Sequence, residues 1–449
     1  MVSAHCPALM ITAPQSDSGK TTVVAAMARY WRNQGKVVRV FKTGPDFIDP
    51  KFHEFASGAP CHQLDLTMMG AAACRRHLHA AAQQADLILI EGVMGMYDGP
   101  SSSAKLAQQF GVPLLAVINA AKMAQTFGAI AHGLATYQSG VDLFGVVANR
   151  VGSAGHGKML QDSLPESIAF CGWLPRSEAL ALPERHLGLV QADEMEQLDC
   201  WLDGAAKLLS ESCDMPLPQP VEFAPQQPCP QRLANATALA GKTIAVAQDL
   251  AFGFIYHDNL ALLRDMGAQL SFFSPLSSNA LPQADALYLP GGYPELHQQQ
   301  LLANTALIDQ IRQFAASNKP IVAECGGMLY LLDELTDIDG VSSKMLGLLP
   351  GKAAMQPKLQ GIGMLTATFS GDDNGVGAGA VNGHCFHYSK TDIAVAPLTI
   401  AKQPHSARVE EGVYQHGSIL ASYVHWYFGS CPQLVAQWFG ASATQGDGK

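Results

Sequence analysis

One short segment near the N-terminus constrains the fold more than any other. An apolar run at residues 8–13 leads into a loop that ends in Gly19-Lys20-Thr21-Thr22, and a helical pattern begins at the lysine. A strand, a tight loop and a helix N-terminus in this order surround a phosphate with backbone N–H groups. In such loops the lysine reaches the outer phosphates and the next hydroxyl binds magnesium. The segment therefore predicts a nucleotide site on a parallel α/β sheet, with the candidate ligands Ser18, Gly19, Lys20, Thr21 and Thr22.

Two residues of this loop depart from the usual phosphate-binding pattern. Pro14 occupies the place of the first glycine, and Asp17 adds a carboxylate where negative charge opposes phosphate. The strand before the loop and the helix after it keep the required order. We therefore keep the prediction of a nucleotide site.

A second cluster of polar residues follows the strand expected at residues 37–41. Lys42 comes directly after this strand, and Asp46 and Asp49 lie in a turn with glycine and proline. Open parallel sheets bind their ligands at the carboxyl ends of strands. Asp46 is thus a candidate for holding magnesium, and Asp49 for orienting a substrate group or balancing charge. An ordinary solvated turn is the alternative.

A third cluster begins where the strand expected at residues 87–90 ends in Glu91. An acid at this position is the usual second element of the magnesium site in P-loop enzymes. A solvated strand end is the alternative for Glu91. Asp98 lies on the glycine-rich loop beyond, where a role in substrate binding and a role in the turn are both open.

The order of apolar runs predicts two α/β domains in series. The chain has 449 residues, too many for one typical core. Residues 213–241 are rich in proline, glutamine and alanine, a linker composition. We expect an ATP-binding domain at 1–212 and a second domain at 242–449. The expected strands are 8–13, 37–41, 87–90, 114–118 and 144–148 in the first domain, and 243–247, 270–273, 286–289 and 321–323 in the second, with further, possibly antiparallel, strands at 363–369 and 419–424.

Composition limits the classes of partner. The net charge is −10 and the pI is about 5.8, which argue against a general nucleic-acid or membrane-surface binder while leaving room for local anion sites. We find no secretion signal and no apolar run long enough to span a bilayer, so we expect a cytoplasmic protein. The ten cysteines form no C-x-x-C pair, so neither a zinc site nor a disulfide framework is indicated.

Cys325 stands out among these cysteines by its context. An apolar run that ends at the cysteine is followed by Gly326 and Gly327 and then by an apolar helical pattern. A strand-to-helix elbow exposes a nucleophile, and the helix N-terminus favours its thiolate. The alternative is a buried, inert cysteine.

Two other segments favour the reactive interpretation of Cys325. Gly291 and Gly292 follow an expected strand, and their N–H groups, with that of Gly326, are candidates for stabilising an oxyanion. His425 lies at the end of a later strand and can take the thiol proton and return it to a leaving amine.

These residues resemble the class I glutamine amidotransferases, in particular the corrin-type family whose glutaminase domain is joined to an amide synthase domain. The resemblance covers nearly the whole chain. Many class I glutaminases have a glutamate two residues after the histidine, where this chain has Tyr427, so the third member of the glutaminase site is open. The segments that carry the resemblance are the N-terminal loop, residues 44–50, 91–99, 184–189, 249–256 and 384–389, and the surroundings of Cys325 and His425.

The resemblance implies a P-loop NTPase-like domain followed by a class I glutamine amidotransferase domain, with two linked reactions. Cys325 would attack the side-chain amide of L-glutamine and release ammonia. In the first domain, ATP with Mg²⁺ would phosphorylate a carboxylate, and ammonia would displace the phosphate. The implied substrate is cobyrinic or hydrogenobyrinic acid, amidated at its a and c acetate groups. The implied roles are ATP and metal binding for Lys20 and Thr21, metal binding for Glu91 and Asp46, phosphate neutralisation for Lys42, and substrate positioning for Asp49 and Asp98.

Two alternatives stay open on the sequence. One is a P-loop positioning ATPase whose second domain only contacts proteins, which would make Cys325 and His425 coincidental. The other is an amide synthase for a different tetrapyrrole, such as nickel sirohydrochlorin. The metal in the ring, the order of amidation and the oligomeric state, for which a homodimer is one expectation, are not determined by the sequence.

Overall fold

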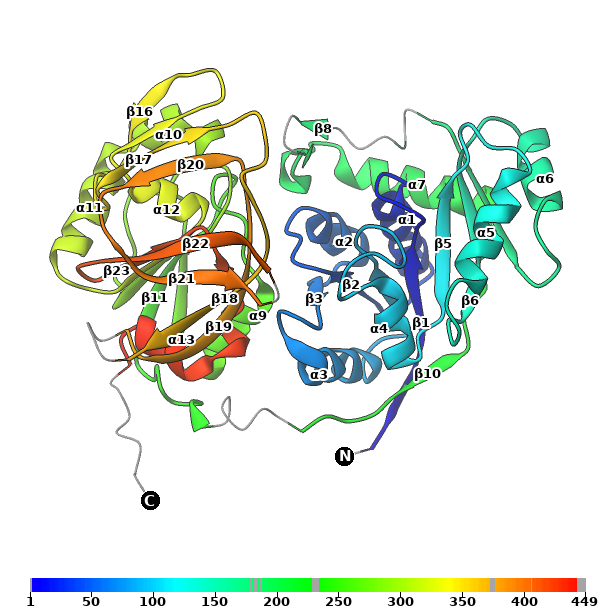
Figure 1. Ribbon diagram of the computed structural model, residues 1–449, viewed down its shortest axis with the longest axis horizontal. Helices are drawn as coiled ribbons and strands as arrows, with labels where there is room; N and C mark the ends of the chain where they lie inside the picture. The colour runs from blue at the N-terminus through cyan, green and yellow to red at the C-terminus, as the bar shows by residue number, and fades with distance from the viewer. Residues whose placement is uncertain are drawn as a thin grey trace. The chain divides into compact units, whose positions relative to one another are not determined.

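The computed structural model describes residues 2–177, 180, 184–185, 188–227, 234–371, 376–404 and 406–441. The chain forms two compact units, divided after Gln227 (Figure 1). Among the helices in the described ranges, none combines the length and the hydropathy needed to cross a membrane.

The first unit is built on one largely parallel sheet. Its strands follow the order β3-β2-β4-β1-β5-β6-β7, and β10 pairs antiparallel with β1. The strands are β1 (Ala4–Thr12), β2 (Val38–Thr43), β3 (His62–Leu64), β4 (Leu87–Glu91), β5 (Leu114–Asn119), β6 (Leu143–Val151), β7 (Phe170–Pro175) and β10 (Pro220–Phe223). A separate pair is formed by β8 (Glu184–Arg185) and β9 (Gly188–Leu189), and residues 186 and 187 of the segment noted above lie outside the described ranges.

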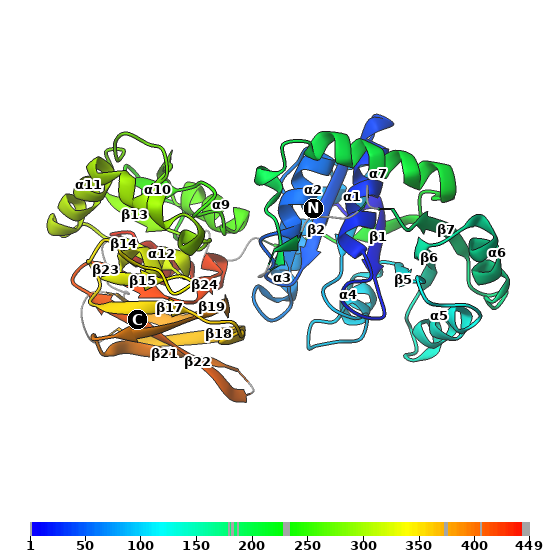
Figure 2. The same ribbon diagram turned by 90° about the horizontal axis from the view of Figure 1, so that it is seen from above.

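Helices cover both faces of this sheet (Figure 2). Leu9 and Ile11 of β1 pack on one side, while Ala8 and Met10 pack on the other, because successive side chains of a strand point to opposite faces. Both faces are apolar, which is why the strands read as near-continuous hydrophobic runs. The first face is covered by α1 (Lys20–Asn33), α2 (Asp49–Ser57) and α7 (Leu198–Ser212), and the second by α3 (Gly70–Ala82), α4 (Ser103–Phe110), α5 (Thr126–Thr136) and α6 (Ala154–Asp162).

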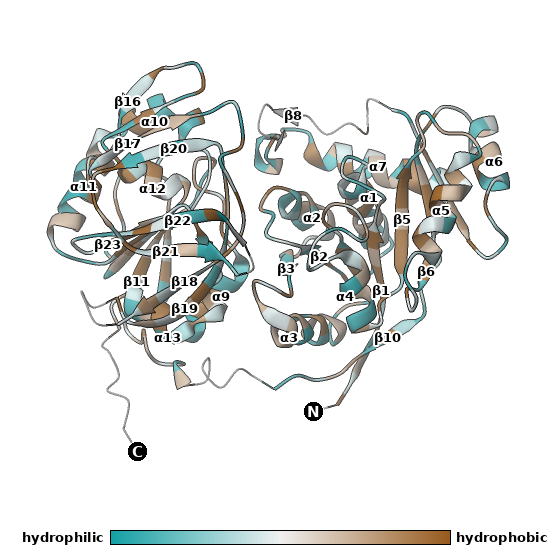
Figure 3. Cartoon of the chain, in the orientation of Figure 1, coloured by the Kyte–Doolittle hydropathy of each residue, from teal (hydrophilic) through white to brown (hydrophobic). Residues whose placement is uncertain are grey.

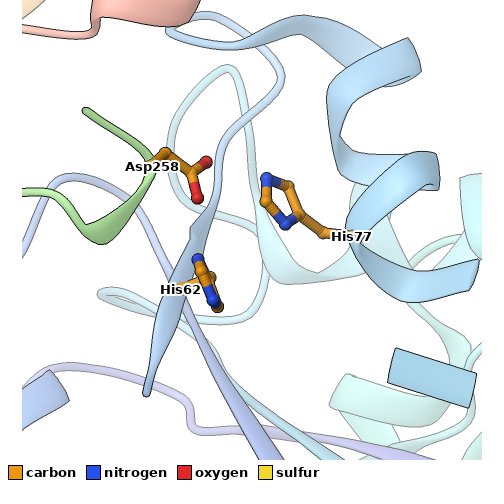
Figure 4. Close-up of side chains that lie close together, drawn as sticks. All are labelled: His62, His77 and Asp258. Carbon is orange, nitrogen blue, oxygen red and sulfur yellow. The ribbon is translucent and has the colours of Figure 1, made fainter. Parts of the chain in front are cut away.

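The edge strand β3 is fixed to the helix that follows it by stacked rings. His62 of β3 and His77 of α3 lie with ring centroids 5.0 Å apart and planes inclined by 29° (Figure 4). This strand has only three residues and was not predicted from the sequence.

The second unit contains a larger mixed sheet. Its order is β12-β11-β13-β14-β23-β22-β21-β18-β19-β24, parallel from β12 to β23 and antiparallel beyond. The strands are β11 (Thr243–Ala247), β12 (Gln269–Phe273), β13 (Ala286–Leu289), β14 (Ile321–Glu324), β18 (Gly361–Ser370), β19 (Ala378–His387), β21 (Pro397–Gln403), β22 (Ser406–His416), β23 (Ile419–Ser422) and β24 (His425–Trp426). A small sheet is formed by β15 (Glu334–Thr336), β16 (Ser342–Lys344), β17 (Gly351–Met355) and β20 (Ser389–Ile393).

Two apolar clusters hold the second unit together. One includes residues of α10 (Gln298–Ala303), α11 (Thr305–Ala316) and α12 (Gly326–Leu331). The other includes residues of α9 (His257–Asp265) and α13 (Pro432–Trp438). In both units the most hydrophobic residues lie in the central strands (Figure 3). The sheets therefore form rigid supports, and the candidate sites lie on the loops at their strand ends.

Most of the expected strands are present at the expected places, with ends that differ by a few residues. The strands at 243–247 and 286–289 have the predicted bounds. The strand expected at 363–369 is β18, which is antiparallel to its neighbours, whereas β23 pairs parallel with β14 and antiparallel with β22. The proline-rich stretch at 213–241 contains an ordered strand, β10, and its residues 228–233 lie outside the described ranges.

Candidate active sites

The N-terminal loop has the geometry of a phosphate-binding turn. Gly19 adopts a left-handed φ of 90°, and a Cβ there would lie 2.1 Å from Nδ2 of Asn149, so only glycine fits. Helix α1 begins at Lys20 with no acidic residue in its first turn and no side chain capping its N–H groups. These N–H groups and the positive end of the helix suit an anion.

Four elements bring the predicted polar residues to one place beside this loop. Glu91, at the end of β4, accepts hydrogen bonds from Oγ1 of Thr21 (2.9 Å) and Nζ of Lys42 (3.0 Å). Lys42 also lies 2.6 Å from Oδ2 of Asp49 and 3.6 Å from Oδ2 of Asp46. Sequence reasoning grouped these residues correctly because the strand ends of a parallel sheet share one edge.

His53 completes this cluster, and the sequence did not reveal it. Its Nε2 contacts Oε2 of Glu91, and both side chains are buried. Burial would raise the pKa of Glu91, but the charges of Lys42 and His53 outweigh burial and lower that pKa. Burial would likewise lower the pKa of Lys42, but the carboxylates of Asp49, Glu91 and Asp46 raise it well above its usual value. Lys42 and Glu91 therefore form a buried ion pair.

The arrangement fits a nucleotide with its metal ion. The Thr21 hydroxyl and the Glu91 carboxylate are the hard oxygen ligands that Mg²⁺ prefers, and they already lie side by side. Nζ of Lys20 donates to the Met94 carbonyl (2.8 Å), and no carboxylate lies within ion-pair distance of it among the described residues. Burial lowers the pKa of Lys20, and the charge of Glu91 opposes this effect. Its charge is thus available to a phosphate.

A cleft of about 680 Å³ opens above this cluster. Beyond the predicted residues it is lined by Asn149 and by three cations, Lys122, Arg150 and Arg176. Sequence reasoning missed these four, although Lys122, Arg150 and Arg176 all lie at or just beyond the carboxyl ends of β5, β6 and β7. With Lys20 and Lys42 they give the cleft five cations against the four carboxylates of Asp17, Asp46, Asp49 and Glu91, a mixed lining that suits an anionic ligand bound together with a cation.

Two of the predicted residues do not line the cleft. Oγ of Ser18 donates to the Gln15 carbonyl (3.0 Å), and the Ser18 carbonyl accepts from Asn149 (2.9 Å). Oδ2 of Asp98 accepts from the N–H of Gly95 (2.9 Å) within its own loop. Both side chains shape loops in this structure, and a substrate role for Asp98 stays a prediction.

Cys325 occupies a strained elbow between β14 and α12. Its φ is 44°, a conformation that a residue with a side chain adopts at a cost of about 1–3 kcal/mol. Its N–H donates to the Ser422 carbonyl (2.8 Å), and its own carbonyl accepts from Leu329 (3.0 Å). The thiol is 7% exposed, and burial, together with the charge of Glu295, raises its pKa. The predicted elbow is present, but the expected exposed thiolate is not, because burial keeps the side chain from solvent and raises its pKa.

The predicted glycines pack directly against this elbow. A Cβ on Gly326 would lie 2.9 Å from both N and O of Gly292, and a Cβ on Gly327 would lie 2.0 Å from the Leu289 carbonyl. Behind the loop, the N–H of Phe254 donates to the Gly291 carbonyl (3.0 Å). The three candidate oxyanion residues are therefore brought together next to the thiol.

His425 packs against the same glycine loop. Its ring is 2% exposed, and the Cε1 atom is 2.1 Å from the position of a Cβ on Gly291. Burial, and then the charges of His384 and His387, lower the pKa of His425 to about 3. The ring is thus neutral at physiological pH, which is the form that a general base requires.

This contact predicts the effect of Gly291→Ala. The added methyl group would displace His425, and a misplacement of about 1 Å costs a reaction about 10²-fold. We expect glutamine hydrolysis to fall by about this factor, while synthesis from free ammonium is unchanged. Gly133→Ala in α5 is the control, because a Cβ there meets no atom within 4 Å. Equal rates for both variants in a glutaminase assay would contradict the arrangement.

The pKa of His425 predicts how stability depends on pH. Between pH 6.5 and about 3 the unfolded chain binds a proton at His425 that the folded chain excludes, so stability falls as pH falls, by up to about 1.4 kcal/mol per pH unit. His425→Gln should remove this slope. The free energy of unfolding of both proteins, measured with denaturant between pH 4.5 and 7.5, checks this prediction. If it changed with pH in the same way in both proteins, the prediction would be wrong.

Comparison with known proteins identifies the family. Residues 9–190 match the family model of the CobQ/CobB/MinD/ParA nucleotide binding domain, and residues 243–432 match that of the CobB/CobQ-like glutamine amidotransferase domain. A hydrogenobyrinate a,c-diamide synthase of Stutzerimonas stutzeri is 52% identical over 97% of this chain and 99% of its own length. The chain belongs to the a,c-diamide synthase family.

Other members of the a,c-diamide synthase family are similar over the same length. A hydrogenobyrinate a,c-diamide synthase of Pseudomonas aeruginosa is 51% identical over 97% of this chain and 98% of its own. A cobyrinate a,c-diamide synthase of Herminiimonas arsenicoxydans is 46% identical over 96% of both chains. Membership in this family confirms the predicted fold class and argues against the positioning ATPase with a non-catalytic second domain.

This member of the a,c-diamide synthase family has no acid two residues after its histidine. Tyr427 occupies that position, and its hydroxyl donates to Oδ2 of Asp258 at 3.2 Å. The Asp258 carboxylate, in the first turn of α9, therefore accepts a hydrogen bond from the tyrosine. A third member of the glutaminase site has to be sought elsewhere.

Proposed function

We propose that this protein catalyses the ATP- and glutamine-dependent amidation of the a and c acetate groups of hydrogenobyrinate or cobyrinate. The observation that carries the proposal is the 52% identity with a hydrogenobyrinate a,c-diamide synthase over nearly the whole of both chains. The two clusters described above supply groups for both halves of such a reaction. The two relatives above 50% identity are named for hydrogenobyrinate, which favours the metal-free ring.

The second unit would release ammonia from glutamine. Sγ of Cys325 attacks the amide carbon while His425 takes the thiol proton, and the N–H groups of Gly291, Gly292 and Gly326 stabilise the oxyanion. His425 then returns the proton to the departing nitrogen, so that ammonia and a thioester result. Water hydrolyses the thioester to glutamate and restores the thiol.

The first unit would use this ammonia. ATP with Mg²⁺ would supply the phosphoryl group that activates the substrate carboxylate, with ADP leaving, and ammonia would then attack the acyl carbon and displace phosphate to give the amide. The loop from Ser18 to Thr22 would hold the phosphates, and Thr21, Glu91 and Asp46 would hold the metal ion. Lys42 would neutralise charge on the transferred phosphate, and Asp49 and Asp98 would position the substrate.

A direct comparison of substrates tests the proposal. Hydrogenobyrinate, cobyrinate and nickel sirohydrochlorin are incubated separately with enzyme, ATP, Mg²⁺ and glutamine, and the products are analysed by mass spectrometry. We expect two amides on hydrogenobyrinate or cobyrinate. Amides on nickel sirohydrochlorin alone, or none on any ring, would refute the proposed substrate. A homodimer also stays a prediction, which light scattering checks.

A further inference from the structure

The backbone that follows His425 is held from both sides by buried side chains. Nδ2 of Asn259 donates to the Trp426 carbonyl at 2.7 Å, and its Oδ1 accepts from the N–H of Phe428 at 2.8 Å. From the other side, Oε1 of Glu324 accepts from the N–H of Trp426 at 3.2 Å. The peptide groups on both sides of Trp426 are therefore fixed. One of these two peptide groups links Trp426 to His425.

Glu324 is itself fixed by a second buried group. The hydroxyl of Tyr288 donates to Oε2 of Glu324 at 2.9 Å, and Asn259, Glu324 and Tyr288 are each at most 1% exposed. We call these three side chains the backbone clamp. Because Glu324 immediately precedes Cys325, the clamp connects the strand that carries the thiol with the segment that carries the histidine.

The clamp holds the side of β24 that the sheet leaves unpaired. Among the described strands β24 pairs with β19 only, where His425 lies opposite His384. Asn259 and Glu324 bond the peptide groups on the two sides of Trp426, and Tyr288 holds Glu324; because a buried polar group that loses its partner is costly, these bonds fix the position of the segment. The same turn of α9 that supplies Asn259 supplies Asp258, the partner of Tyr427. Residues 426–428 are thus tied to α9 by three hydrogen bonds.

We propose that the backbone clamp positions His425 for proton transfer to and from Cys325, the task that a glutamate performs in glutaminases with an acid two residues after the histidine. The proposal rests on the proposed hydrolysis of glutamine at this site. An acid orients the ring by a hydrogen bond, whereas the clamp orients it by fixing the main chain from which it projects. Asn259, Glu324 and Tyr288 are positioning residues, since they act through the backbone.

The geometry defines what each substitution removes. Asn259→Ala removes both contacts of the amide, and Asn259→Asp keeps the acceptor for Phe428 but places an oxygen against the Trp426 carbonyl. Glu324→Gln keeps an acceptor for the N–H of Trp426. Because burial raises the pKa of Glu324 to about 8, the neutral amide of glutamine resembles the protonated acid. Glu324→Ala keeps neither contact. Tyr288→Phe loses one hydroxyl without loss of core volume.

The test measures glutamine hydrolysis and ammonium-supported amidation in the full-length variants. We expect Asn259→Ala, Asn259→Asp and Glu324→Ala to lower kcat for glutamine by about 10- to 100-fold, with KM changed by less than about threefold. Glu324→Gln should restore most of kcat, and Tyr288→Phe should give an intermediate loss. Ammonium-supported amidation should stay at the wild-type rate, which shows that the first unit is intact, and the nearly unchanged KM for glutamine shows that the second unit is folded.

Asn304→Ala is the matched control for Asn259→Ala. Its amide also donates to two backbone carbonyls in the same unit, those of Pro275 (3.1 Å) and Ser278 (3.0 Å), and it does not contact residues 426–428. Equal loss of kcat in both asparagine variants, or an unchanged kcat in Asn259→Ala and Tyr288→Phe, would refute the proposed role of the clamp. Neither result would contradict the proposed function. Wild-type protein that does not hydrolyse glutamine overturns the proposed function and the clamp with it.

Discussion

Replacement of Cys325 by alanine is expected to abolish amide synthesis from glutamine while synthesis from free ammonium continues. The thiol forms the covalent bond to the substrate, and loss of a nucleophile removes that route entirely, so the glutamine-dependent rate should fall by about three orders of magnitude or more. The nucleotide cluster lies in the other unit, around Lys20 and Glu91, and does not use the thiol. Product formation from each nitrogen source, followed by mass spectrometry, measures both rates.

The control for this variant is another buried cysteine of the same unit. Cys385 is buried, as Cys325 is, but lies within β19 and has no elbow geometry. Cys385→Ala should keep both activities. If a folded Cys325→Ala protein lost synthesis from ammonium as well, the separation of the two reactions would be wrong.

The central parallel strands were predictable because they are buried on both faces. Runs such as 87–90 and 286–289 are apolar throughout and are bounded by polar turns, so their position follows from composition alone. The short edge strand β3 and the proline-rich strand β10 carry no such signal. Residues 220–223 form β10 because their backbone pairs with β1, a contact that the local sequence pattern does not indicate.

The site residues divide in the same way. Thr21, Lys42 and Glu91 were found because each directly follows a strand or opens a helix, and the topology of a parallel sheet brings such positions together. His53 lies inside α2 and Asn259 inside α9, where nothing in the local sequence indicates their partners. Their roles depend on tertiary contacts over 38 and 167 residues. Sequence patterns indicate where strands and helices end. Only the fold shows which helix residues contact those ends.

Replacement of Lys20 by alanine should stop amide synthesis from both nitrogen sources. Its ammonium group is the natural partner of the outer phosphates, and charge-assisted contacts of this kind are strong in a buried cleft. We expect the rate to fall by about 10²- to 10³-fold with glutamine and with ammonium alike. The fold should be little affected, because the side chain makes one hydrogen bond, to the Met94 carbonyl.

Lys105→Ala is the matched control, because Nζ of Lys105 also donates to a single carbonyl, that of Pro100 at 3.2 Å, but on the surface of α4. It should keep both rates. The decisive comparison is with Cys325→Ala: ammonium should support synthesis in that variant and fail to do so in Lys20→Ala. If ammonium supported synthesis in Lys20→Ala at the wild-type rate, the loop at Gly19 would not hold the nucleotide, and the cations around the cleft would need another ligand.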